Sequence, residues 1–332
     1  MLARLGVVAD VQYADKPDGA HTRVVPHEIR RYRTALRKLR DAVDSFIAEN
    51  THGTPIVGTV LHLGDLIDGN ETLARTRRDF DAVMGQFDRM AAAGVAQVHV
   101  LGESQTLAPP AQHTAQPDAP DTAVALAGNK DMQLPREEVM GALAAAQPGW
   151  APYYEHRLSP RCSVAVLDST EVSLQGPLIE AAREFMAQRP RPPEALSANG
   201  GVGPAQLAWL RDDVLRRARA EGRRVIVAGH NPLLAEASRP GGFTRAIGWQ
   251  ALAELLDEHA DVCPLYLAGH FHGGGYSRRA SGVHHVTVEG IVEEGGHAVL
   301  RWFDDRVEIS STGGTTTRLL PLDGGVCCQA RL

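Results

Sequence analysis

The chain has 332 residues, of which 43% are hydrophobic and 22% charged, and its formal net charge is −6. This balance is typical of a globular protein and argues against a general nucleic-acid binder, which needs an excess of basic residues. No segment approaches the roughly 20 apolar residues of a membrane helix, and the first residues lack the features of a secretory leader. We therefore expect a cytoplasmic protein that binds neither nucleic acid nor membranes.

Apolar runs that end in polar loops alternate with amphipathic segments along the first 270 residues. The apolar runs predict strands at Leu5–Ala9, Gly58–Leu63, Val95–Leu101, Ser163–Leu167, Arg224–Ala228 and Val262–Ala268. The amphipathic segments predict helices at Glu28–Asn50, Thr72–Ala93, Gly203–Ala220 and Trp249–His259. Further strands are predicted at Gly282–Glu289, His297–Phe303 and Arg306–Ser311. This order indicates an α/β domain with a mixed sheet and a β-rich closing half.

Residue types that can bind divalent metal ions follow five apolar segments, one of which ends at Gly128. They are Asp10 and Gln12, then Asp65 in Gly64-Asp65-Leu66-Ile67-Asp68, then Asn129, His230, and the pair His270 and His272. Taken alone, an Asp after a strand is more often a turn or helix cap, and a Gly-His pair is usually structural. The ordered set is different, because ligands of open α/β sheets lie beyond the carboxyl ends of the strands. Carboxylate, amide and imidazole groups together suit first-row divalent cations.

The ordered set resembles the calcineurin-like metallophosphoesterase pattern D-x-[HQ], G-D-x-x-D, G-N-H-[DE], G-H and G-H-x-H. Three further segments make the chain similar to the manganese-dependent ADP-ribose/CDP-alcohol diphosphatases: Arg31-Tyr32-Arg33, Asn199-Gly200-Gly201 and Ala268–Tyr276. So does Gln12, which stands where most of the superfamily has His. The resemblance implies a four-layer αββα sandwich, with two mixed β-sheets flanked by helices. It also implies one domain over residues 1–318, followed by a tail at 319–332.

The same resemblance implies two divalent cations, with Mn²⁺ favoured and Mg²⁺ or Fe as alternatives. The first site would comprise Asp10, Gln12, Asp65 and His272, and the second Asp65, Asn129, His230 and His270, so that Asp65 bridges the two. Two cations about 3.5–4 Å apart can activate a water and clamp phosphoryl oxygens. The neutral amide oxygen of Gln12 favours Mn²⁺ or Mg²⁺ over Zn²⁺. Asp65, Asn129, Lys130 and His230 form the expected catalytic set.

Two more residues near these motifs have open roles. Asp68 either orients a metal ligand or caps the helix that follows Gly69. Tyr276, which follows the His-x-His loop, either stacks on a base or sugar of the substrate or is structural.

The activity that the resemblance implies is hydrolysis of a phosphoanhydride bond. We expect the protein to be a monomer. The substrates would be small nucleoside-diphosphate-linked compounds, namely ADP-ribose, CDP-alcohols such as CDP-choline or CDP-glycerol, and cyclic ADP-ribose. The products would be a nucleoside monophosphate and a phosphorylated moiety. Two alternatives stay open: a phosphodiesterase or phosphomonoesterase of the same superfamily, and a catalytically impaired protein that binds metals and partners.

The sequence departs from the family pattern at Lys130, which stands in place of the motif His. Lysine keeps a positive charge but is a poor proton donor at neutral pH, since its pKa is normally near 10. A phosphate leaving group needs little protonation, so this change favours anhydrides over alkyl esters. It is also the feature that favours a catalytically impaired protein.

A second departure is the segment Glu103–Gly128, which separates the predicted strand Val95–Leu101 from Asn129. Without it, Val98–Gly102 would run directly into Asn129, as in the uninterrupted family motif. The residues at both junctions can be encoded by splice-donor and splice-acceptor consensus sequences. The segment is therefore either a flexible surface insertion or a retained intron.

Overall fold

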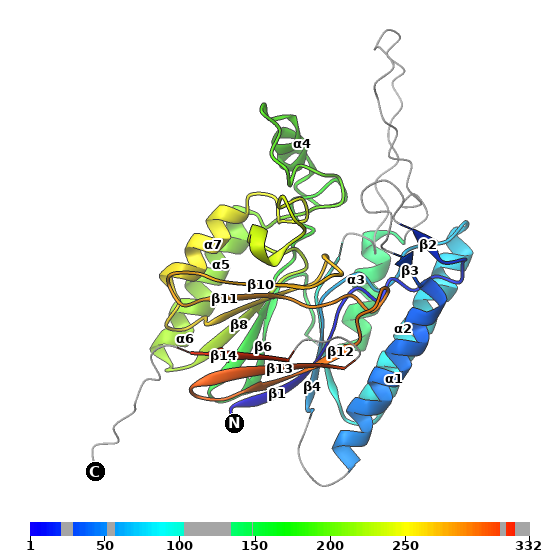
Figure 1. The fold of residues 1–332 in the computed structure, drawn as a ribbon, viewed down its shortest axis with the longest axis horizontal. Coiled ribbons are helices and arrows are strands. Elements are labelled where there is room, and N and C mark those ends of the chain that lie inside the picture. Colours follow the sequence, from blue (N-terminus) through cyan, green and yellow to red (C-terminus); the bar gives the residue numbers. More distant parts are fainter. Residues whose placement is uncertain (21–28, 52–56, 103–133, 148, 313–316, 323–332) are drawn as a thin grey trace.

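A computed structural model describes residues 1–20, 29–51, 57–102, 134–147, 149–312 and 317–322. Within these ranges the chain forms two six-stranded sheets that lie against each other, with helices on both outer sides (Figure 1). The predicted four-layer sandwich of two mixed sheets is confirmed.

The first sheet has the strand order β14-β13-β12-β1-β4-β5. β1 pairs in parallel with β4 and antiparallel with β12, and β4 pairs in parallel with β5. Its strands are β1 (Ala3–Val8), β4 (Thr59–His62), β5 (Ala96–His99), β12 (His297–Trp302), β13 (Arg306–Thr312) and β14 (Thr317–Pro321). The three parallel strands therefore point their carboxyl ends toward one edge.

The second sheet has the order β10-β11-β9-β8-β7-β6, and β7, β8, β9 and β11 are parallel. Its strands are β6 (Tyr154–Ser159), β7 (Cys162–Val166), β8 (Arg224–Ala228), β9 (Leu265–Ala268), β10 (Gly275–Arg278) and β11 (His284–Thr287). A two-stranded ribbon, β2 (Gly19–Ala20) and β3 (Ile29–Arg30), lies between β1 and the first helix.

Apolar side chains of both sheets form one core, which also includes the buried faces of α1 (Tyr32–Thr51) and α2 (Leu73–Ala92). A second core lies between the second sheet and the helices α5 (Pro204–Trp209), α6 (Arg217–Ala220) and α7 (Trp249–Glu258). Figure 1 shows α1, α2 and α3 (Arg136–Ala146) on one side of the sheets and α5–α7 on the other. The strand ends that carry the motifs therefore meet at the seam between the sheets.

The structure refines several predicted elements. The helix expected over Gly203–Ala220 contains a π-helical segment, η3 (Leu210–Arg216), between α5 and α6. β9 begins at Leu265 rather than at Val262, because the backbone nitrogens of Val262 and Cys263 bond to His259 in a turn. The segment Gly176–Ala198 contains a short helix, α4 (Ile179–Ala187), which projects from the body of the molecule in Figure 1.

The expected domain boundary at residue 318 falls within β14, so the first sheet continues into the segment that we expected to be a tail. Residues 103–128 of the expected insertion lie outside the described residues, as do Asn129 and Lys130.

Candidate metal centre

Six of the predicted site residues converge at the seam between the two sheets. Gln12 Nε2 lies 2.7 Å from Asp65 Oδ2 and 3.2 Å from His272 Nε2, and His272 Nε2 lies 3.6 Å from Asp10 Oδ1. On the other side of Asp65, its Oδ1 lies 3.5 Å from His230 Nε2, which is 3.1 Å from His270 Nδ1. Asp65 thus contacts both groups, as a bridging carboxylate must.

The three histidines are each oriented by a hydrogen bond on the ring nitrogen that faces away from this cluster. His230 Nδ1 lies 2.7 Å from the carbonyl oxygen of Leu63. His270 Nε2 lies 2.8 Å from Asn199 Oδ1, and His272 Nδ1 lies 2.6 Å from Glu293 Oε1. Each acceptor fixes a proton on the nitrogen that it faces, so the opposite nitrogen is directed at the cluster. Such a hydrogen bond on the outer ring nitrogen is typical of histidines that bind metals.

Several residues of the site have a strained backbone conformation, as is common at functional sites. In the described ranges, the non-glycine residues with positive φ are Asp10, Gln12, Asp65 and His270, with values from 41° to 66°. All four are predicted metal ligands. A left-handed conformation costs roughly 1–3 kcal/mol per non-glycine residue and persists only where the surroundings enforce it. Here the strain directs side chains from strand ends into a common space.

The donor set fits a divalent cation at the first site. Gln12 is 2% exposed, and its Oε1 is buried without a hydrogen-bond partner among the described residues. A buried amide oxygen without a partner costs free energy, and a cation would provide the missing interaction once the amide turns its oxygen toward Asp65 and His272. The pKa of His272 is raised to about 9: burial alone would lower it, but Asp10 and Glu293 together outweigh that effect. In the metal-free protein this imidazole is therefore protonated, and a bound cation would displace the proton.

Comparison with known proteins agrees with this geometry. The model of the calcineurin-like phosphoesterases matches residues 3–274. The chain belongs to the calcineurin-like phosphoesterase family. As a member of this family it is a metal-dependent hydrolase whose site is built for two divalent cations.

The chain is also similar to curated enzymes of this family. It is 30% identical to the manganese-dependent ADP-ribose/CDP-alcohol diphosphatase of Arabidopsis thaliana, over 88% of the chain and 87% of the relative. The Mus musculus protein of the same name is 27% identical over 96% of the chain and 93% of the relative. Among solved structures, a dimetal phosphatase from Danio rerio has the same fold, with a TM-score of 0.78, 24% identity and coverage of 97% and 99% of the two chains.

Within this phosphoesterase fold, Asp68 makes ion pairs and does not cap a helix. Its Oδ2 accepts from Lys16 Nζ at 2.7 Å, and its Oδ1 accepts from Arg30 Nη1 at 2.9 Å. The N-cap of α2 is Thr72, whose side chain accepts from the backbone N of Arg75. The capping alternative for Asp68 is therefore wrong.

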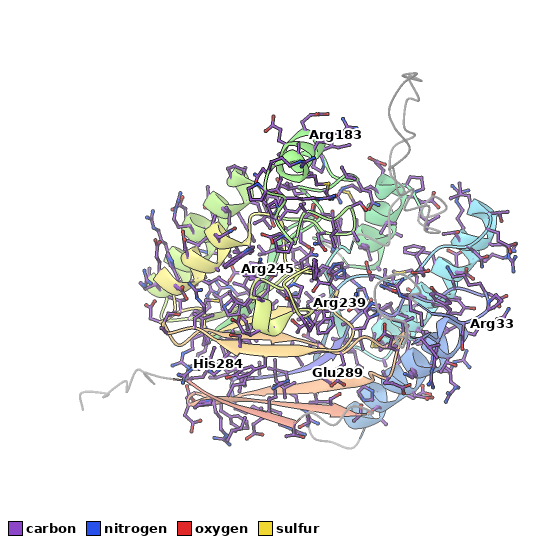
Figure 2. The ribbon with its side chains drawn as sticks, turned by 45° about the horizontal axis from the view of Figure 1, so that its top comes forward. Arg33, Arg183, Arg239, Arg245, His284 and Glu289 are labelled. Carbon is purple, nitrogen blue, oxygen red and sulfur yellow. The ribbon has the colours of Figure 1, made fainter. Side chains whose placement is uncertain are left out.

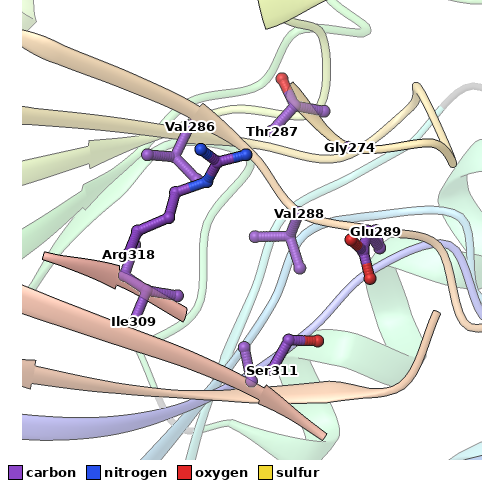
Figure 3. Close-up of a pocket in the computed structure, with 9 residues that line it drawn as sticks. Gly274, Val286, Thr287, Val288, Glu289, Ile309, Ser311 and Arg318 are labelled. Atoms are coloured by element: carbon purple, nitrogen blue, oxygen red, sulfur yellow. The ribbon is translucent and has the colours of Figure 1, made fainter. Parts of the chain in front are cut away.

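Tyr276 lies in β10 at the edge of the second sheet. Its hydroxyl lies 3.0 Å from His284 Nδ1, and the guanidinium of Arg318 lies over its ring. The contact with Arg318 of β14 joins the two sheets, and both contacts favour a structural role. A cavity of about 30 Å³ lies beside this edge, lined by residues that include Gly274, Ile309 and Arg318 (Figure 3). Its lining contains none of the predicted metal ligands.

Sequence reasoning missed the residues that orient the histidines. Asn199 and Glu293 stand 71 and 21 positions from their partners, so spacing gives no sign of the pairing. Asn199 lies in a segment that carries the family resemblance, which was the available signal for it. Lys38 of α1 supports the loop of Glu293, because its Nζ donates to the carbonyl oxygens of Ile291 and Gly295 at 3.2 and 3.1 Å.

Proposed function

We propose that the protein is a manganese-dependent diphosphatase of ADP-ribose and CDP-alcohols. It would cleave the phosphoanhydride bond to release a nucleoside monophosphate and a phosphorylated moiety. The observation that carries this proposal is that two groups of metal-binding side chains share Asp65. In each group, a hydrogen bond on the ring nitrogen that faces away from the cluster orients the histidine. The names of the Arabidopsis thaliana and Mus musculus relatives support the metal and the substrates.

In this proposal Asp10, Gln12, Asp65 and His272 hold the first cation, and Asp65, Asn129, His230 and His270 the second. When bound, two such cations supply an activated water and neutralise charge on the phosphoryl oxygens. The chain itself fixes the geometry. Both carboxylate oxygens of Asp10 accept from the backbone N of His270, at 3.1 and 2.9 Å, which ties the loop after β1 to the loop after β9. This bond holds ligands from both sheets in one place.

The loop between η4 (Ala235–Ala237) and α7 contains the basic side chains Arg239 and Arg245. Arg245 Nη2 donates to Glu194 Oε2 at 2.9 Å, and its guanidinium lies over the ring of Trp249. Figure 2 shows Arg239 and Arg245 near the middle of the view, while Arg33 lies at its margin beside α1.

The protein would act as a cytoplasmic monomer on small-molecule nucleotides. Its described cysteines, Cys162 and Cys263, are buried free thiols, which suits a reducing compartment. No helix in the described part of the chain has the length and apolar character of a membrane span. Light scattering of the purified protein tests the monomeric state, and a dimer mass would contradict it.

The deciding experiment is hydrolysis of ADP-ribose and CDP-choline by purified protein, with and without Mn²⁺. Release of AMP and CMP should require the metal and should be lost in Asp65→Ala, because both sites share this carboxylate. Asp41→Ala is the matched control, since Asp41 lies on α1 with its side chain 63% exposed. Bound manganese should fall in Asp65→Ala alone. Protein that holds two metals and cleaves neither compound would reject the proposed substrates.

A further inference from the structure

The ammonium group of Lys38 lies where three backbone carbonyl oxygens converge. Its Nζ donates to the carbonyl oxygens of Ile291 at 3.2 Å and Gly295 at 3.1 Å, and also to that of Glu293. An ammonium has three N–H groups, so these acceptors use all of them. We call the three oxygens the carbonyl cluster of residues 291–295. The cluster lies in the loop between β11 and β12, so the contact joins this loop to α1.

Three carbonyl oxygens that face one point need a cation or a strong donor between them. Each oxygen carries a partial negative charge, and in ion channels rings of backbone carbonyls bind monovalent cations for this reason. The loop that carries the cluster, residues 288–296, has no helix or strand of its own. Its conformation therefore depends on contacts with other segments, and Lys38 supplies the charge that keeps the three oxygens together.

The same loop contacts two of the proposed ligands of the first cation. The backbone N of Val292 donates to the carbonyl oxygen of Asp10, and that of Gly290 donates to the carbonyl oxygen of His272, both at 3.0 Å. The side chain of Glu293 lies 2.6 Å from His272 Nδ1 through its Oε1. Glu293 thus meets the ammonium at its carbonyl oxygen and the imidazole at its carboxylate. A shift of its backbone would carry the carboxylate away from the imidazole.

The histidines proposed for the second cation are oriented from other segments. His230 Nδ1 faces the carbonyl oxygen of Leu63, and His270 Nε2 faces Asn199 Oδ1. Neither acceptor belongs to the loop between β11 and β12. A change in that loop should therefore act on the first site and leave the second in place.

We propose that the carbonyl cluster is a binding site for a primary ammonium, which Lys38 fills, and that this cation sets the manganese affinity of the first site through Glu293. The inference rests on the proposed function in one respect, the assignment of His272 to the first cation. Lys38 acts through another residue and is a positioning residue. Without an ammonium, the three oxygens would turn toward water, Glu293 would move, and His272 would lose the carboxylate that orients it.

Two substitutions separate the ammonium from the rest of the side chain. Lys38→Ala removes the charge and leaves space in which a small alkylammonium ion can bind. Lys38→Met also removes the charge, but its unbranched side chain occupies most of that space. Arg37→Ala is the matched control, because Arg37 is the preceding residue and its side chain is 68% exposed.

Calorimetry on the metal-stripped protein measures manganese binding, with propylammonium or tetramethylammonium chloride at equal ionic strength. We expect Lys38→Ala and Lys38→Met to weaken the first site by about 10–100-fold and to leave the second unchanged. Propylammonium should restore most of the affinity of Lys38→Ala and none of that of Lys38→Met. Tetramethylammonium has the same charge but no N–H group, so it should restore neither. Arg37→Ala should match wild type in every condition.

Normal manganese affinity in both Lys38 variants would overturn the link to the metal site. Equal rescue of Lys38→Ala by the two ammonium ions would overturn the carbonyl cluster as a specific site, since a general salt effect would then explain the result. Loss of both manganese ions, with no rescue by propylammonium, would show that Lys38 supports the fold as a whole and would also overturn the proposal.

Urea unfolding of metal-free Lys38→Ala tests the site without manganese. Propylammonium that binds the folded chain should raise the free energy of unfolding of this variant, and should leave that of wild type unchanged because Lys38 already fills the site. His272→Ala separates the two proposals: if it binds manganese like wild type, the proposed ligand set fails. The urea measurement then still decides whether the cluster binds an ammonium, and an equal effect of propylammonium on Lys38→Ala and wild type would reject it.

Discussion

At the scale of single residues, the site depends on side chains that form hydrogen bonds to the predicted metal ligands and so orient them. Glu293 Oε1 lies 2.6 Å from His272 Nδ1 and supplies a negative charge to an otherwise buried imidazole. Glu293→Gln keeps the shape but removes that charge, so His272 becomes a weaker ligand. We expect manganese affinity to fall about 10–100-fold, measured by calorimetry on the metal-stripped protein.

Glu294→Gln is the matched control for this change, because Glu294 is the next residue and its side chain is 80% exposed. Its manganese affinity should equal that of wild type. A Glu293→Gln variant that binds manganese normally would show that the carboxylate does not tune His272.

Lys130 stands where the family motif has His, and its part in catalysis can be tested directly. Lys130→His would restore the family motif and a side chain that can donate a proton at neutral pH. We expect turnover of an alkyl or aryl phosphate to rise, by up to about 10²-fold, since general acid catalysis is typically worth 10²–10⁴. The gain on ADP-ribose should be smaller, because its leaving group is a phosphate. Parallel assays of both substrates decide this, and equal rates in the two proteins would remove Lys130 from the catalytic argument.

The sequence was sufficient to predict which side chains meet, and insufficient to predict what surrounds them. Asp10, Asp65, His230 and His272 each follow a strand, and parallel strands bring their ends together. The partner of Asp68 depends on where the β2–β3 ribbon folds back. No local sequence pattern predicts that position. The sequence therefore left Asp68 between two roles, and the structure shows it paired with Lys16 and Arg30.

At the scale of elements, buried strands with continuous apolar runs were the most predictable part of the fold. β1, β4, β7 and β8 lie within or close to their predicted ranges, because each is covered on both faces. β6 was not predicted, since its sequence Tyr-Glu-His-Arg-Leu-Ser is mostly polar and it forms an edge of the second sheet. Pairing with β7 makes it a strand, and that is a tertiary contact.

The end of β5 gives an element-scale prediction. Gly102 packs so closely that a Cβ there would collide with the Oδ1 and backbone N of Asp65. Gly102→Ala should displace the bridging carboxylate, and we expect manganese affinity and turnover to drop at least about tenfold, in line with a ligand moved from its place. Metal content and ADP-ribose hydrolysis are the measurements.

Gly85→Ala provides the contrast, since Gly85 lies inside α2 and an added Cβ meets nothing within 4 Å. This variant should keep full activity and gain about 0.5–1 kcal/mol in the free energy of unfolding. If both variants behave alike, steric contact with Asp65 is not what makes glycine necessary at position 102.

At the scale of the whole molecule, the two sheets bury three histidines for which the described part of the chain shows no ion pair. His62 and His99 lie in the first sheet and His285 in the second, all between 0% and 1% exposed. Burial holds the pKa of His99 at about 4 and, with Arg279 adding to it, that of His285 at about 4. Burial, reinforced by His99 and His230, keeps the pKa of His62 well below its ordinary value. These three imidazoles are therefore neutral in the folded protein at neutral pH.

This burial predicts a loss of stability in mild acid. An unfolded chain protonates its histidines near pH 6.5, while the folded chain resists until about pH 4, so in this window the unfolded state binds more protons. The contribution of these three histidines to the free energy of unfolding should be full above pH 6.5 and should be lost as the pH drops toward 4. His99 and His285 each account for a loss on the order of 3 kcal/mol at the lower limit. In the metal-free protein, His272 acts with the opposite sign, but only between pH 6.5 and about 9.

Urea unfolding of the metal-free protein at several pH values measures this slope. His99→Gln and His285→Gln remove one titrating group each, so each should make the curve between pH 4 and 6.5 less steep, even where the substitution lowers stability at pH 7.5. The double variant should flatten it further, because the two residues lie in different sheets and should act independently. A slope that these substitutions leave unchanged would assign the acid sensitivity to carboxylates, whose protonation acts at lower pH.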